Sequence, residues 1–265
     1  MYHLHAQILR RSDGRSATAA AAYRSASKIT DQRTGMVWDF SRKRFTTPLA
    51  LVLPEGTPIE LADRATLWND VEVHAKRRDA QVAREFEVAL PHDLTRDGET
   101  ALVLRFARWL VSTYSIAVDA CIHRVPGNRH AHLLTTTSTL GPDGIGGKVR
   151  ALDLIAAKKE NPTVGSPIEA IREQWESMTN EALAAAGSVR RVDRRSLAEQ
   201  GIDRTPQQHQ GPTATAIARR GGTPDRTRTL AQKPREDKHE TQPRQRTRRR
   251  SEPEHAPQHH RTHRR

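Results

Sequence analysis

The 265-residue sequence has very little cysteine, few aromatic side chains and no long apolar segment. A single cysteine, Cys121, excludes an intramolecular disulfide framework and is typical of a reducing cytoplasm. No run approaches the roughly 18 apolar residues of a membrane-spanning helix. The first 16 residues place their basic side chains after a short apolar stretch, the reverse of a secretory signal. We therefore expect a cytoplasmic protein without a membrane segment.

Positive charge is what the sequence has in excess. Its 44 Lys and Arg residues outnumber 31 Asp and Glu residues, which gives a formal net charge of +13 and favours a polyanionic partner such as nucleic acid. About nine of these charges lie beyond Gly201, where Pro, Gln, Arg and His are frequent and apolar periodicity is almost absent. Such a segment cannot bury enough apolar surface to offset its ordering entropy. We predict a folded domain over residues 1–220 and a disordered basic tail over residues 221–265.

Apolar periodicity in the first three-quarters of the chain indicates both helices and strands. It predicts helices over residues 17–29, 59–80, 97–114 and 167–187, and strands over residues 2–9, 49–54, 85–91, 116–124 and 130–138. Ser16 is suited to cap the first helix, and Gly187 is suited to end the last. The last two strands are separated by a short turn, which requires antiparallel pairing. The sequence therefore predicts an α+β domain rather than an all-parallel sheet.

The most informative segment contains His123, His130 and His132 around a Pro-Gly turn. Successive strand residues point to opposite faces, so His130 and His132 project from the same face of one strand. With an even number of turn residues, His123 lies opposite His130 and shares that face, whereas a three-residue turn sends it to the other face. Three imidazoles beside open positions are typical of a catalytic metal site. The alternative is a set of polar residues on a solvated strand face.

Tyr23 is a candidate nucleophile in the alanine-rich helix predicted over residues 17–29. Its small neighbours let the helix approach the sheet closely and leave the phenol prominent, although an ordinary packed tyrosine has the same pattern. Arg15, Arg24 and Lys28 lie on or beside this helix and are suited to holding phosphates. The sequence thus indicates a phosphate-binding surface around Tyr23.

Further polar residues are candidates for supporting roles. Glu85 and Glu87 share one strand face, and either could orient a ligand histidine, with Glu87 slightly favoured. The alternative is that both lie on a solvated strand face. Trp38, Arg42 and Lys43 could stack on bases and hold phosphates, or could form a surface loop with one buried tryptophan. Cys121, which is expected opposite His132, is either a fourth metal ligand or a small core residue.

Four blocks of the sequence resemble, in order and at similar spacing, those of the MobA/MobL relaxases in the HUH endonuclease superfamily. The blocks read GRSATAAAAYRSASKITDQRTG, REFEVALP, HxxxxxxHxH and VDRRSLAEQGIDRTPQQHQGP. The resemblance extends from Tyr2 to about Gly222 and leaves the tail outside it. One departure is Arg194, which stands where the fourth block of the family commonly has a histidine. This substitution puts in doubt, for this chain, any DNA or structural contact that the family histidine makes.

The resemblance implies a fold and a set of residue roles. The implied fold is a central antiparallel sheet flanked by helices, with the metal triad on the sheet and a tyrosine helix over it. Tyr23 aligns with the transesterifying tyrosine of the family. His123, His130 and His132 align with its metal triad, which is similar to sites served by Mn²⁺ or Mg²⁺. Single-stranded DNA from an origin of transfer would lie in the basic cleft between them.

The activity implied by this resemblance is that of a DNA relaxase. Such an enzyme nicks one strand at a plasmid origin of transfer and keeps a 5′-phosphotyrosyl link to it. Through this link the enzyme would be delivered to the recipient cell with the DNA, where it rejoins the strand after conjugative transfer. Accessory mobilisation proteins and a conjugative coupling protein, which could read the basic tail, are the implied partners. Three rivals stay open: a three-histidine nuclease that uses water, a non-catalytic DNA-binding accessory protein, and a related replication initiator or transposase.

Overall fold

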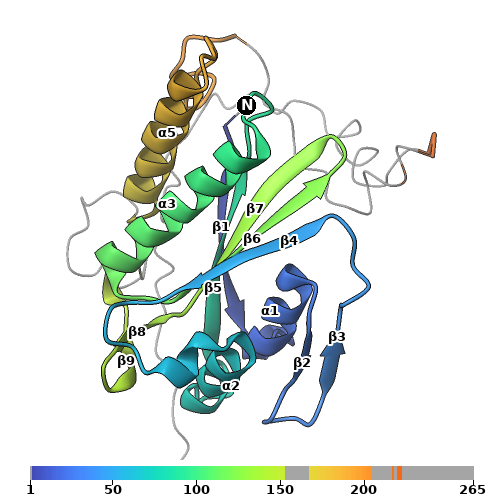
Figure 1. The fold of residues 1–265 in the computed structure, drawn as a ribbon, viewed down its shortest axis with the longest axis vertical. Helices are drawn as coiled ribbons and strands as arrows, with labels where there is room; N and C mark the ends of the chain where they lie inside the picture. Colours follow the sequence, from blue (N-terminus) through green and yellow to red (C-terminus); the bar gives the residue numbers. More distant parts are fainter. Residues whose placement is uncertain (1, 153–166, 204–216, 218–219, 223–265) are drawn as a thin grey trace, which may run out of the picture. The chain divides into compact units, whose positions relative to one another are not determined.

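A five-stranded antiparallel sheet forms the centre of the fold (Figure 1). The computed structural model describes residues 2–152, 167–203, 217 and 220–222. The chain divides into two units after Asp203, and the sheet with its helices belongs to the first. The tail predicted from residue 221 lies outside the described residues from 223 onward. Its disorder and the domain boundary at residue 220 therefore stay predictions.

The strands of the sheet follow the order β1-β5-β7-β6-β4, and each neighbouring pair is antiparallel. Their bounds are β1 Leu4–Arg10, β4 Thr46–Val52, β5 Gln81–Ala89, β6 Val118–Val125 and β7 Asn128–Thr135. Two hairpins accompany the sheet, β2 Lys28–Thr30 with β3 Val37–Asp39, and β8 Ser138–Gly141 with β9 Gly144–Lys148. The principal helices are α1 Ala17–Ser25, α2 Arg64–His74, α3 Arg96–Tyr114 and α5 Pro167–Ala185. The predicted α+β class with an antiparallel sheet is confirmed.

Helices α3 and α5 cover one face of the sheet (Figure 1) with an apolar core. Phe86 and Ile122 of the strands are buried there against the helices. Phe106 of α3 lies 5.0 Å from Trp175 of α5, measured between ring centroids, and both side chains are buried. Burial of several large apolar side chains makes this face the main source of hydrophobic stabilisation.

Helices α1 and α2 cover the opposite face through a second core that is rich in alanine. Ala21 of α1 and Trp68 of α2 are fully buried in it with Leu134 of the sheet. The buried carboxylate of Glu72 accepts a hydrogen bond from the backbone N–H of Ala17 at 2.6 Å. This bond satisfies one of the free N–H groups at the start of α1 and fixes that helix to α2.

Two predicted helices are shorter than expected. The helix predicted over residues 59–80 is interrupted at Asp63, whose backbone is extended and whose side chain accepts a hydrogen bond from the N–H of Thr66 at 2.8 Å. That carboxylate caps a new helix, α2, which ends at His74. The helix predicted over residues 17–29 ends at Ser25, because Ala26 has a φ of 52° and Lys28 begins strand β2.

The turn between β6 and β7 contains two residues, Pro126 and Gly127. Gly127 has a φ of 75°, a left-handed conformation that glycine adopts without steric cost. The resulting register pairs His123 with His130 and Cys121 with His132. The predicted even-length turn is therefore confirmed, and the three histidines share one face of the sheet.

Candidate functional site

Three histidines form a cluster on the sheet face that α1 covers. Their ring centroids lie 4.3 Å apart for His123 and His132, 4.9 Å for His130 and His132, and 5.3 Å for His123 and His130. Each ring offers one nitrogen, and these nitrogens all lie within 4.8 Å of one another. His123 and His132 are buried, and His130 is half-buried. The hairpin therefore places three nitrogen donors around one point.

Hydrogen bonds leave one ring nitrogen of each histidine available as a ligand. Because carbonyl and carboxylate oxygens only accept, His132 Nδ1 donates to Glu85 at 2.8 Å, and His130 Nδ1 donates to the Asn128 carbonyl at 3.0 Å. Both Nε2 atoms then keep their lone pairs. His123 Nε2 lies 2.9 Å from the Arg24 carbonyl, which leaves its Nδ1. Burial and, secondarily, the nearby charge of His132 lower the pKa of His123 to about 3, which favours the neutral ring at pH 7.

Glu85 lies beneath the cluster and connects it to α1. Its fully buried carboxylate accepts hydrogen bonds from His132 Nδ1, from Arg24 Nε and Nη2, and from Gln7 Nε2 on β1. Burial alone would raise the pKa of Glu85, but the hydrogen bonds from His132 and Arg24 hold it well below its usual range. The group therefore stays a carboxylate that fixes the His132 ring and the end of α1 together.

Tyr23 occupies the last turn of α1 and is 45% exposed. Its ring meets Phe40 edge-on at 5.3 Å and His123 at 6.3 Å between centroids. Lys43 Nζ lies 3.5 Å from the centre of the Tyr23 ring, a cation–π geometry that holds the ring from one side. The phenol is thus the exposed side chain of a helix that is otherwise packed on the sheet beside the histidines.

Lys43 joins the tyrosine to the histidine cluster. Its Nζ donates to the Tyr23 carbonyl at 3.0 Å and lies 3.3 Å from His123 Nε2. Burial and, secondarily, the positive charge of Arg24 lower the pKa of Lys43 to about 8. Lys43, predicted as a DNA-binding residue, therefore lies directly beside the histidine cluster.

The remaining phosphate- and base-binding candidates fall into two groups. The side chains of Arg15, Lys28 and Arg42 are exposed. Arg24 differs from the expectation: it is buried and bonded to Glu85, because an arginine facing the sheet requires a buried counter-charge. Trp38 packs against the second core but is only half-buried, and it lies in strand β3 rather than in the surface loop with a buried tryptophan that was the alternative.

Three other residues singled out from the sequence do not form part of the histidine cluster. Glu87, slightly favoured over Glu85 from the sequence, pairs with His132 in the strand register. Among the described residues, however, it is Glu85 that accepts a hydrogen bond from His132. Cys121 is buried, burial raises the pKa of its thiol, and it is not among the three residues whose donor atoms come together in the described part of the chain. Arg194 lies 3.3 Å from Glu176 on α5 and binds that helix.

Gln7 is the site residue that the sequence reasoning missed. It lies directly opposite Glu85 in the β1–β5 ladder and donates to that carboxylate. The only available signal was its place in the alternation of β1, on the same face as His5. That signal gains meaning only when the pairing of β1 with β5, which are about 75 residues apart, is known.

The fold and the cluster together define an α+β protein with a three-histidine, metal-type site beneath a helix that carries an exposed tyrosine. The model of the MobA/MobL family matches residues 15–220. The chain belongs to the MobA/MobL family of relaxases.

Individual relatives agree with this family. Mobilization protein MobL of Acidithiobacillus ferridurans is 38% identical over 254 residues, covering 86% of this chain and 66% of that protein. Conjugal transfer protein TraA of Agrobacterium fabrum is 34% identical and covers 82% of this chain but 22% of that protein. The chain thus spans just under two thirds of the first relative and less than a quarter of the second.

A solved structure has a similar fold. It is described as "Molecular Basis of Vancomycin Resistance Transfer in Staphylococcus aureus", is 30% identical and superposes with a TM-score of 0.65 over 74% of this chain and 99% of that chain. Among the described residues of the present chain, no helix combines the length and apolar character needed to cross a membrane.

Proposed function

We propose that the chain nicks one strand of DNA at an origin of transfer, with Tyr23 as the nucleophile, and rejoins the strand after transfer. The observation that carries the proposal is the Arg24–Glu85–His132 chain of hydrogen bonds. It joins the residue next to Tyr23 to the three-histidine cluster through one buried carboxylate. A nucleophile and a metal-type site held together in this way suit attack on a phosphate placed between them.

The histidine cluster fits a divalent cation, which we propose to be Mn²⁺ or Mg²⁺. His123, His130 and His132 would hold it, since each keeps one ring nitrogen free of hydrogen bonds to acceptors. When bound, such a cation would polarise the non-bridging oxygens of the scissile phosphate. Glu85 would fix the ring of His132 so that its Nε2 lone pair points into the cluster.

The proposed step exchanges one phosphodiester for another. The Tyr23 oxygen loses its proton to water and forms a bond to phosphorus, while the bond from phosphorus to the 3′ oxygen breaks. The departing 3′ oxygen takes up a proton and becomes a free hydroxyl, and the 5′ end stays attached to Tyr23. No oxidation occurs, and because the phosphodiester is conserved, attack by a 3′-hydroxyl reverses the step.

Residues around the phenol have complementary roles in this scheme. Lys43, 3.5 Å from the centre of the Tyr23 ring, holds the ring and offers positive charge beside the phosphate. Exposed Arg15, Lys28 and Arg42 would hold flanking phosphates. The names of MobL and TraA relatives indicate mobilisation and conjugal transfer. For this chain we propose single-stranded DNA, accessory mobilisation proteins and a coupling protein as partners.

A covalent-adduct assay tests the proposal. Short single-stranded tiles from the replicon that encodes the chain are incubated with the full chain and Mn²⁺, and the products are separated on a denaturing gel. We expect one tile to yield a protein–DNA adduct and a free 3′ fragment. Tyr23→Phe should abolish the adduct, while Tyr114→Phe, a half-buried tyrosine at the end of α3, should retain it. Cleavage without an adduct would instead support a nuclease that uses water.

A further inference from the structure

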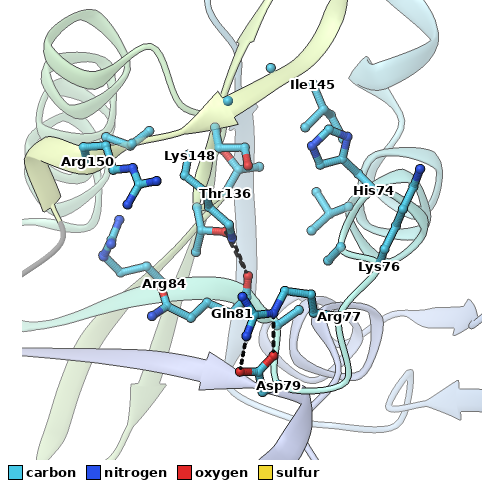
Figure 2. A pocket seen from close by; sticks show the side chains of 18 residues that line it. His74, Lys76, Arg77, Asp79, Gln81, Arg84, Thr136, Ile145, Lys148 and Arg150 are labelled. Atoms are coloured by element: carbon cyan, nitrogen blue, oxygen red, sulfur yellow. Dashed lines mark hydrogen bonds and ion pairs between the residues drawn. The ribbon is translucent and has the colours of Figure 1, made fainter. Parts of the chain in front are cut away.

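A cavity of about 530 Å³ lies apart from the histidine cluster, near the start of β5. Its walls come from the end of α2, the segment that leads into β5, the end of β7 and the β8–β9 hairpin. Figure 2 shows Arg84 and Arg150 on one side, His74 and Lys76 on the other, and Lys148 between them. A cavity of this size accommodates one nucleotide unit and is too small for a duplex.

Basic side chains dominate the cavity. Five Lys and Arg residues line it, namely Lys76, Arg77, Arg84, Lys148 and Arg150. Among its described lining residues the one carboxylate is Asp79, which Arg77 engages through Nε and Nη2, both at 2.9 Å. Among these described lining residues, basic side chains therefore outnumber acidic ones.

Lys148 and Arg84 place two of these charges close together. Lys148 Nζ is fixed by the Gln81 carbonyl at 2.9 Å and by Thr137 Oγ1 at 2.6 Å. Arg84 is buried, and its Nη2 donates to the Leu152 carbonyl at 3.0 Å. Burial lowers the pKa of Lys148, and the charge of Arg84 lowers it further. The amine of Lys148 is thus held in place in the cavity wall, where an anion bound beside it would stabilise its charged form.

The cavity is distinct from the histidine cluster but within reach of the same DNA strand. Thr136, which directly follows β7, is six residues from His130, which corresponds to at most roughly 20 Å at about 3.4 Å per strand residue. A nucleotide strand advances by at least about 3.4 Å per nucleotide. A strand cut at the histidines could therefore place in this cavity a phosphate roughly six nucleotides away or fewer.

The geometry points to a phosphate-binding site in this cavity, in which Lys148 and Arg150 bind a nucleotide phosphate remote from the cut. The phosphate belongs either to the backbone of the bound DNA strand, in which case the inference rests on the proposed function, or to a free nucleotide. Both sources offer the same chemistry, a tetrahedral anion with several acceptor oxygens that suits Lys and Arg donors.

Amine footprinting of the full chain without added metal tests this site locally, despite the basic tail. Acylation of Lys148 and of Lys28, an exposed lysine of β2, is followed by mass spectrometry with and without inorganic pyrophosphate. Only the unbound fraction reacts, so we expect Lys148 acylation to slow about tenfold at about ten times Kd. Lys28 should react at an unchanged rate. Equal rates for Lys148 with and without pyrophosphate would overturn the inference.

Matched variants and a DNA arm complete the test. Arg150→Gln removes an exposed cavity charge without altering the hydrogen bonds of Lys148, and it should abolish the protection; Arg108→Gln, an exposed residue of α3, should keep it. In the DNA arm, oligo(dT) of 24 nucleotides replaces pyrophosphate. If it protects Lys148 in the wild-type chain but not in Arg150→Gln, the site binds the DNA backbone. Protection by pyrophosphate alone assigns it to a free nucleotide. Because no cutting is measured, failure of the nicking proposal would leave this result interpretable.

Discussion

Both faces of the central sheet bury apolar side chains, and the face beneath α1 also holds the histidine cluster with its buried polar partners. Beneath α3 and α5, Phe86, Phe106 and Trp175 form an apolar core. Beneath α1, the buried set includes Glu85 and Arg24, which bind each other, together with the histidines. Buried ion pairs are weak sources of stability because desolvation offsets the attraction, but they hold a fixed geometry. The face beneath α3 and α5 therefore has the larger aromatic core, and the face beneath α1 adds the polar network that holds the histidines and α1 together.

The apolar face should give the largest effect on stability. Phe106→Ala removes a fully buried ring that contacts Trp109 and Trp175, and we expect a loss of about 3–5 kcal/mol in the free energy of unfolding. Urea denaturation followed by tryptophan fluorescence measures it. Arg108→Ala, an exposed change on the same helix, should stay within about 0.5 kcal/mol. Equal losses for the two variants would contradict the assigned role of this face.

The site face should instead govern metal affinity. Glu85→Gln removes the carboxylate that accepts from His132 Nδ1, and we expect Mn²⁺ affinity to fall about 10–100-fold. Electron paramagnetic resonance of free Mn²⁺ measures the affinity, and circular dichroism checks the fold. Glu87→Gln, on the same face of β5, should leave the affinity within about a factor of three of the wild-type value. If Glu87→Gln weakened binding more than Glu85→Gln, Glu85 would not be the group that orients His132.

The contrast between the faces also explains what the sequence could predict. The register of His123 with His130 depends only on local alternation and on a short turn, and that part of the site was predicted correctly. The partner of His132 depends on the pairing of β5 with β7, whose strands are separated by a helix, and here Glu87 was preferred wrongly over Glu85. Local patterns determine faces within a strand, and long-range register determines which side chains meet.

Helix α1 shows the same limit. An alanine-rich helix has no apolar stripe to indicate which side faces the sheet, so Arg24 was expected on the DNA side although it is buried against Glu85. The break at Asp63 was missed because the apolar spacing continues across it, whereas the side chain of Asp63 caps the helix that follows. The role of Tyr23 came from the family resemblance and stays a proposal.

Low pH should weaken the hydrogen bonds that hold the start of α1, and this provides a further test of how the face beneath α1 differs from the face beneath α3 and α5. The buried carboxylate of Asp31 accepts from Thr18 Oγ1 at 2.6 Å and from Ser16 Oγ at 3.1 Å. Burial alone would raise the pKa of Asp31, but hydrogen bonds from Thr18 and Thr34 lower it below its usual value. A carboxyl group whose pKa is lower in the folded state stabilises the fold at pH values above its unfolded-state pKa of about 3.9. This stability is lost as the pH falls through the folded-state pKa.

The measurement compares Asp31→Asn with the wild-type chain by urea denaturation between pH 7 and pH 2. We expect a difference in the free energy of unfolding of about 1–2 kcal/mol at pH 7, shrinking below about pH 4 as the wild-type carboxyl is protonated. Asp143→Asn, an exposed change, should show little difference at any pH. A gap between Asp31→Asn and wild type that stayed constant down to pH 2 would exclude this linkage.

The smallest expected effect distinguishes the helices of the two faces by their N-caps. Ser16 accepts from the Ala19 N–H at 3.3 Å to begin α1, and Thr95 accepts from the Gly98 N–H at 3.1 Å to begin α3. Each replacement by alanine should cost about 1 kcal/mol in the free energy of unfolding.

Hydrogen exchange should nevertheless distinguish the two variants. Ser16→Ala should speed exchange of the α1 amides about fivefold, because that helix has nine residues and its opening depends on its ends. The middle of α3, with 19 residues on the apolar core, should be unaffected by Thr95→Ala. Equal acceleration in both helices would mean that α1 is held no differently from α3, and that the polar network beneath it does not set the position of Tyr23.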